Sequence, residues 1–155
     1  MLFRSEGSEI GAAFGLIQLE SLENNIKTRE KNFDIQTRFF KQYEEYFILP
    51  RQTEGAKTAW LAYPVIIREN APFSRKEFQI FLEKRNIQTR TVFTGNITRQ
   101  PGYKNLEMKK SKDGYKNSDN VMRGGVLLAC HHGLTSEMMD YMHDTINTFL
   151  KLKKS

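Results

Sequence analysis

The apolar residues of the first fifty positions recur at helical spacing, and no proline interrupts positions 8 to 47. Those that repeat every seven residues are Leu19, Ile26, Phe33, Phe40 and Phe47. This pattern predicts one long helix, or two in line, over 8–47. A coiled coil is the alternative, although aromatic side chains at the later positions suit packing on a sheet better. The cluster "GAAFG" at 11–15 lets another backbone approach closely, so we expect a partner outside this segment to pack there.

Three apolar stretches predict strands. They are "AWLAYPVIIRE" at 59–69, "IQTRTVFT" at 87–94 and "GGVLLACHH" at 124–132. Pro64 inside the first stretch indicates an edge strand or a bulge, because proline cannot donate to a sheet ladder. The polar residues 104–120 are interpreted as a loop.

Two further helices follow from local signals. Ser74 stands three residues before Glu77, as in a capping box, and Phe73 and Phe78 occupy the positions of a hydrophobic staple. This helix is expected to run to about residue 85, with Asn86 as a left-handed stop. A last helix is predicted within 134–151. Its expected apolar face consists of Met138, Tyr141, Met142, Thr145, Ile146, Phe149 and Leu150.

The order of these elements is helix, strand, helix, strand, loop, strand, helix, without internal repeats or low-complexity segments. It predicts an α+β fold in which a short sheet of about three strands is covered by helices. With 155 residues, of which 39% are hydrophobic, the chain is expected to form one domain over 1–155.

The stretch "IQTRTVFTGNITRQPG" at 87–102 combines a β-branched run with a Gly-Asn pair and a Gln-Pro-Gly break. These signals predict a strand that carries a shaped polar loop. Arg90 and Arg99 bring two fixed charges that suit a phosphate or a carboxylate. The alternative is an arginine pair that stabilises the turn.

Composition excludes several classes of function. No run of about eighteen apolar residues is present, and an acidic residue interrupts the first positions, so we expect neither a membrane span nor a signal peptide and place the chain in the cytoplasm. The net charge of +6 does not favour a nucleic-acid partner, because acidic residues are interspersed with basic ones and no fingerprint accompanies them. The single cysteine, Cys130, is interpreted as a buried thiol.

Residues for catalysis or metal binding are scarce. Cys130, His131 and His132 are neighbours in a predicted strand and would point to alternating faces, so no metal site is expected. No phosphate-binding glycine loop or nucleophile elbow occurs. Asp119 and Glu69 have no identifiable partner and are interpreted as solvated carboxylates. We therefore name no catalytic residue.

Three longer segments carry a family resemblance. They are "SEIGAAFGLIQLESL", "RNIQTRTVFTGNITRQPGY" and "NSDNVMRGGVLLACHHGLTSEMMDYM". Across nearly all its length the chain resembles the C-terminal part of DegT/DnrJ-type pyridoxal-phosphate sugar aminotransferases, most of all the branch of nucleotide-sugar 3-dehydratases and lipopolysaccharide-biosynthesis proteins. The resemblance implies the small C-terminal domain of fold type I pyridoxal-phosphate transferases. In such enzymes the large domain, here expected upstream of residue 1, holds the cofactor.

The resemblance also implies roles for individual residues. Arg90, Asn96 and Arg99 would face the polar groups of a nucleotide-sugar substrate, and Arg4 would approach the cofactor. Leu2 stands where the family usually has an asparagine before the Phe-Arg pair. A single cysteine does not support the iron–sulfur cluster of some dehydratases. No pyridoxal phosphate is expected on this chain alone.

Two functional hypotheses remain. In the first, the chain is the small-domain part of a sugar aminotransferase or 3-dehydratase and is inactive alone. In the second, it is a non-catalytic binding or scaffold protein that kept the fold. In either case the first helix would contact the missing large domain or a second copy of the chain.

Overall fold

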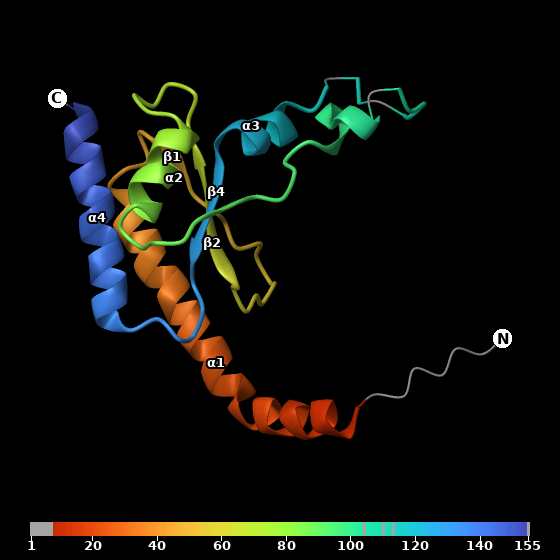
Figure 1. The fold of residues 1–155 in the computed structure, drawn as a ribbon, viewed down its shortest axis with the longest axis vertical. Helices are drawn as coiled ribbons and strands as arrows, with labels where there is room; N and C mark the ends of the chain where they lie inside the picture. The colour runs from red at the N-terminus through yellow and green to blue at the C-terminus, as the bar shows by residue number, and fades with distance from the viewer. Residues whose placement is uncertain (1–7, 104, 110, 113, 155) are drawn as a thin grey trace.

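The computed structural model describes residues 8–103, 105–109, 111–112 and 114–154 (Figure 1). Within them, helices and an antiparallel sheet form a mixed α+β fold, as the sequence predicts. The elements are α1 (Glu9–Lys41), β1 (Phe47–Ile48), β2 (Ala62–Ile67), α2 (Arg75–Glu83), β3 (Arg90–Thr91), the 3-10 helices η1 (Ile97–Arg99) and η2 (Pro101–Tyr103), α3 (Lys116–Gly124), β4 (Gly125–Ala129) and α4 (Ser136–Lys154).

The described sheet has four strands in the order β1-β2-β4-β3, one more than the sequence predicts. The additional strand is β1, because the first helix ends at Lys41 and Phe47 pairs with Ile67. Phe47 fits the seven-residue apolar repeat although it lies in a strand, because its side chain is buried in the same core as those of Phe33 and Phe40. The predicted strand at 87–94 shrinks to the two residues of β3.

Pro64 lies in an inner strand whose pairing with β4 is unbroken, so it marks neither the edge strand nor the bulge that were predicted as alternatives. It pairs with Leu127 of β4, whereas β1 pairs only with Ile66 and Ile67. The short β1 therefore leaves Pro64 beyond the β1–β2 ladder. A proline is tolerated there because no ladder hydrogen bond to β1 is required.

The core lies on one face of the sheet, where α4, α2 and the C-terminal part of α1 gather (Figure 1). Burial alternates strictly along β2, so that Tyr63, Val65 and Ile67 point into this core. Phe40 and Phe78 meet them from the helices and are fully buried. The opposite face of β2 is only partly covered.

Local chemistry determines the start of α2, as predicted. The Ser74 Oγ accepts a hydrogen bond from the Glu77 N–H at 3.2 Å, and the Ser74 N–H donates to Glu77 Oε2 at 2.8 Å. The rings of Phe73 and Phe78 lie 6.2 Å apart and form the staple. Asn86 has a φ of 60° and takes the predicted left-handed conformation after the helix.

Two sequence predictions about helices need correction. The polar region 104–120 was expected to be a loop, but α3 begins within it at Lys116. On α4, Met139 is buried, whereas the predicted core residues Met138 and Tyr141 are about half exposed. The remaining members of the predicted apolar face of α4 are buried.

The N-terminal half of α1 extends away from the body of the molecule (Figure 1). Residues 8–22 are all exposed. The large apolar side chains among them are Ile10, Phe14, Leu16, Ile17, Leu19 and Leu22. A β-carbon at Gly15 would meet nothing within 4 Å, so no described residue packs on "GAAFG". No helix of the described chain is long and apolar enough to cross a membrane.

Candidate functional site

The polar loop that follows β3 is fastened to α3 at Gly95. This glycine has a φ of 68°, and a β-carbon added to it would lie 2.3 Å from the Cα of Met122. Both facts require glycine, because other residues rarely adopt positive φ and no side chain fits in that space. The loop backbone therefore lies directly on the helix.

Asp119 of α3 binds two of the predicted site residues. The Arg99 guanidinium donates two hydrogen bonds to it, from Nε to Oδ1 at 3.0 Å and from Nη2 to Oδ2 at 2.8 Å. Asn96 Nδ2 donates to the same Oδ1 at 2.7 Å. The hydrogen bonds from Arg99 and then Asn96 lower the pKa of Asp119 to about 2. Asp119 is thus not the solvated, unpaired carboxylate that the sequence suggests.

Asn96 also shapes the loop itself. Its Oδ1 accepts hydrogen bonds from the Thr98 N–H at 3.0 Å and the Thr98 hydroxyl at 2.7 Å, which caps η1. The amide is buried, with 3% of the residue exposed. Every hydrogen bond of the Asn96 side chain in the structure is made to another residue of this chain. We call Asn96, Thr98, Arg99 and Asp119 the loop latch.

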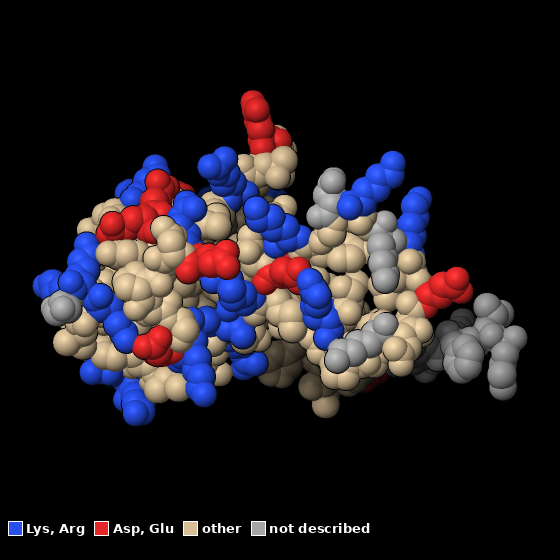
Figure 2. Space-filling view, turned by 90° about the horizontal axis from the view of Figure 1, so that it is seen from above, with Lys and Arg blue, Asp and Glu red and all other residues tan. Residues whose placement is uncertain are grey.

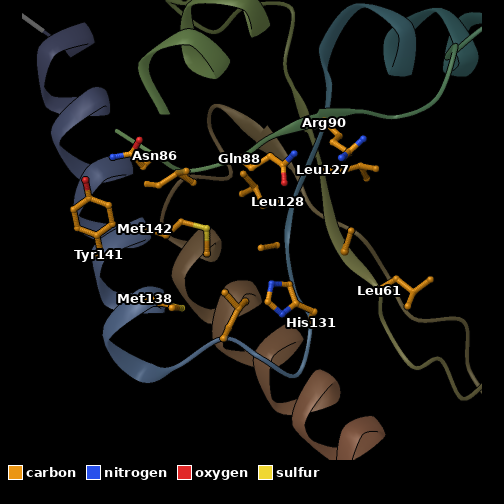
Figure 3. A pocket seen from close by; sticks show the side chains of 14 residues that line it. Leu61, Asn86, Gln88, Arg90, Leu127, Leu128, His131, Met138, Tyr141 and Met142 are labelled. Atoms are coloured by element: carbon orange, nitrogen blue, oxygen red, sulfur yellow. The ribbon is translucent and has the colours of Figure 1, made fainter. Parts of the chain in front are cut away.

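Arg90 lies apart from the loop latch, at a cavity of about 450 Å³ beside β4 (Figure 3). Strand β3 pairs only with Val126 and Leu127 of β4. The next residues of β4, Leu128 and Ala129, therefore have no strand beside them on the edge away from β2, and the cavity lies along this edge. The lining residues are Leu61, Ala62, Asn86, Ile87, Gln88, Arg90, Leu127, Leu128, Ala129, His131, Leu134, Met138, Tyr141 and Met142.

The edge cavity, as we call this space, has apolar walls and a few polar groups. Figure 3 shows Gln88 and His131 on either side of it, with Tyr141 and Met142 on the α4 wall. The Tyr141 hydroxyl donates to the Arg85 carbonyl at 3.1 Å and ties α4 to the end of α2. Arg90 is exposed, and no ion pair joins it to a carboxylate of the described residues. Its guanidinium is therefore available to an anion.

The two adjacent histidines have separate local roles. His131 Nδ1 accepts from the Gly133 N–H at 3.1 Å, and His132 Nδ1 lies 3.3 Å from Arg29 Nη2. Burial raises the pKa of the neighbouring Cys130 thiol to about 11. No group of metal-binding side chains occurs in the described chain.

Known proteins resemble this chain over most of its length. Residues 5–147 match the profile of the DegT/DnrJ/EryC1/StrS aminotransferase family. The chain belongs to this family. It is 30% identical, over 94% of its length, to the lipopolysaccharide biosynthesis protein RfbH of Salmonella typhimurium, of which it covers 33%. It is also 30% identical, over 92% of its length, to a dTDP-4-dehydro-2,6-dideoxy-D-glucose 3-dehydratase of Saccharopolyspora spinosa, of which it covers 30%.

Two solved enzyme structures share the fold of this chain. The Escherichia coli GDP-4-keto-6-deoxy-D-mannose-3-dehydratase with hydrated pyridoxal phosphate superimposes with a TM-score of 0.75 at 22% identity, over 86% of this chain and 33% of that one. An aminotransferase from Psychrobacter cryohalolentis gives a TM-score of 0.79 at 16% identity, over 100% of this chain and 43% of that one. The chain thus spans about a third of the curated relatives.

Pyridoxal phosphate does not fit the edge cavity by itself. Its lining contains neither a lysine for a Schiff base nor a carboxylate for the pyridine nitrogen. Arg4, which the family resemblance places at the cofactor, lies outside the described residues. On the face shown in Figure 2, acidic side chains lie among the basic ones, so this face carries no patch of a single charge sign.

Proposed function

We propose that this chain is the C-terminal part of a cytoplasmic, pyridoxal-phosphate-dependent nucleotide-sugar aminotransferase or 3-dehydratase of deoxysugar and lipopolysaccharide biosynthesis, and that it is inactive alone. The observation that carries the proposal is the family match over residues 5–147, together with relatives named for these reactions. When bound, the cofactor supplies the electron sink for either reaction. The residues of this chain bind and position the substrate.

We assign different tasks in this proposal to Arg90, Asn96 and Arg99, the three residues expected at the substrate. Arg90 is the direct contact, because its guanidinium is exposed at the edge cavity and has no carboxylate partner among described residues. Asn96 and Arg99 are positioning residues, since Asp119 holds both of them. They keep the polar loop in one conformation before a ligand arrives, which reduces the entropy lost on binding.

A large domain that holds the cofactor is the partner in this proposal. It would cover the N-terminal half of α1, whose exposed apolar residues include Phe14, at 69% exposure. Apolar surfaces of this kind usually mark a contact. The second candidate function is that of a binding or scaffold protein. One observation favours it, because within the loop latch the charges of Arg99 and Asp119 neutralise each other without a ligand.

Product analysis tests the proposal. The coding sequence upstream of this chain is examined for a cofactor domain, and the two protein products are tested together with pyridoxal phosphate, glutamate and either GDP- or dTDP-4-keto-6-deoxyhexose. We expect turnover that neither product shows alone. Mass spectrometry separates the two reactions, because transamination exchanges the keto oxygen for an amine, whereas the glutamate-coupled 3-dehydratase reaction leaves a keto sugar that has lost one hydroxyl oxygen. Nucleotide-sugar binding by this chain without turnover by the pair would favour the binding protein.

A further inference from the structure

Phe93 has an unusual conformation for a large side chain. Its φ is 45°, in the left-handed region that bulky residues avoid. Its side chain does not explain this conformation, because Phe93 is 90% exposed and enters no aromatic pair or core cluster of the described residues. Backbone strain of this kind persists only where the surroundings enforce it, and it concentrates at functional positions.

The surroundings of Phe93 do enforce it. The Phe93 N–H donates to the Thr91 carbonyl at 2.9 Å directly after β3, and the Gly95 N–H donates to the Val92 carbonyl at 3.1 Å, which closes a four-residue turn with Phe93 and Thr94 at its centre. Two residues later, Gly95 lies against Met122. The chain is thus held on both sides, by the sheet and by α3. The backbone at Phe93 is therefore fixed, and its ring lies in solvent.

A hollow of about 350 Å³ adjoins this ring. Its polar lining includes Arg75, Thr94 and Gln100. Arg75 Nη1 donates to the Met122 carbonyl at 2.7 Å, which fixes the guanidinium against the same helix. No carboxylate of the described residues pairs with Arg75, so its other N–H groups can bind an anion.

We propose that Phe93 stacks on the nucleobase of the nucleotide-sugar and that Arg75, in the adjoining hollow, binds its phosphates. This inference rests on the proposed function. A rigid aromatic face beside a fixed guanidinium matches a ligand that joins a flat ring to a diphosphate. Stacking tolerates any base, because every base has a π-face. Phe93 would therefore serve GDP- and dTDP-sugars alike, and both kinds of nucleotide occur in the names of the relatives.

Calorimetric titration of the 155-residue chain with GDP, dTDP and inorganic pyrophosphate tests the inference. The variants are Phe93→Ala, which removes the ring, and Phe93→Trp, which retains a stacking surface. Ile97→Ala is the matched control, because Ile97 is an exposed apolar residue of the same loop that does not line the hollow. The Tm of each variant is measured in parallel.

We expect Phe93→Ala to weaken GDP and dTDP about tenfold or more and to leave pyrophosphate affinity and Tm unchanged. Phe93→Trp should bind both nucleotides at least as tightly as the parent, and Ile97→Ala should match the parent. Equal nucleotide affinities for parent and Phe93→Ala would overturn the inference, as would a parent chain that binds neither nucleotide at millimolar concentration. Loss of self-association with unchanged nucleotide affinity would make Phe93 an interface residue instead. None of these results decides the proposed reaction, which the product analysis tests separately.

Discussion

Replacing Gly95 with alanine tests whether contact between the polar loop and α3 is what maintains the loop latch. The new β-carbon would lie 2.3 Å from Met122 Cα and 2.6 Å from Met122 N. Both are backbone atoms, so no side-chain rotation can relieve the clash. The loop must move away from α3, and the Asn96 and Arg99 hydrogen bonds to Asp119 must lengthen with it.

The expected loss of stability has two contributions. A left-handed conformation costs a non-glycine residue about 1 to 2 kcal/mol. Inserting a carbon into occupied space costs about 1 to 3 kcal/mol more. For a domain of this size, a total of about 2 to 5 kcal/mol corresponds to a Tm lower by roughly 4 to 20 °C.

Two other glycines separate these contributions. Gly114 has a φ of 71° with nothing near its β-carbon position, so Gly114→Ala reports the conformational cost alone. Gly102 has neither a positive φ nor a close neighbour, so Gly102→Ala should leave Tm almost unchanged. We therefore expect the Tm values to fall in the order Gly102→Ala, Gly114→Ala, Gly95→Ala.

The pKa of Asp119, followed by NMR, connects this change to the loop latch. In the parent chain Arg99 and Asn96 hold this pKa at about 2, and in Gly95→Ala we expect it to rise toward its ordinary value of 3.8. Gly114→Ala should leave it low. The reasoning would be refuted if Gly95→Ala and Gly114→Ala had the same Tm and the same Asp119 pKa.

Four further outcomes are expected. By calorimetry, Arg99→Ala should lower Tm by only about a few degrees, because the ion pair with Asp119 is largely exposed. By light scattering, the parent chain should self-associate and Phe14→Asp should reduce this more than Gln18→Asp. By absorbance, the folded chain alone should form no borohydride-sensitive aldimine with pyridoxal phosphate. Hydrogen bonds from Lys153 and Ser74 lower the pKa of Glu77 from 4.5 to about 2. The stability that the charged Glu77 contributes to the fold should therefore be lost as the pH falls from 4.5 to about 2, whereas the stability of Glu77→Gln should show no such loss.

Local signals made some of the fold predictable. The start of α2 follows from the side chains of Ser74 and Glu77, which satisfy backbone groups within the same turn. The conformation of Asn86 is equally local. By contrast, β1 exists because Phe47 and Ile48 pair with Ile66 and Ile67, about twenty positions later. No periodicity within 41–48 indicates that pairing.

The candidate site was predictable only in part, for the same reason. The loop around Asn96 and Arg99 is recognisable in the sequence, but its partner Asp119 belongs to a helix with few apolar residues. Packing on the sheet places that helix, since a β-carbon at Gly124 would lie 2.4 Å from the Ile67 carbonyl oxygen. The Gly124–Gly125 pair was the available signal, because adjacent glycines indicate a close backbone approach.

Arg90 and Arg99 are equivalent as sequence signals, yet the fold gives them different physical roles. Arg99 forms a planar, bidentate pair with Asp119, so its charge is neutralised and its geometry is fixed. Arg90 lies on a two-residue strand at the mouth of the edge cavity, without such a partner among the described residues. Ligand recognition needs a free charge on a rigid support. In the proposed function, the Arg99–Asp119 pair would supply part of the support and Arg90 would supply the charge, so the two arginines would act together only because the intervening loop is folded onto α3.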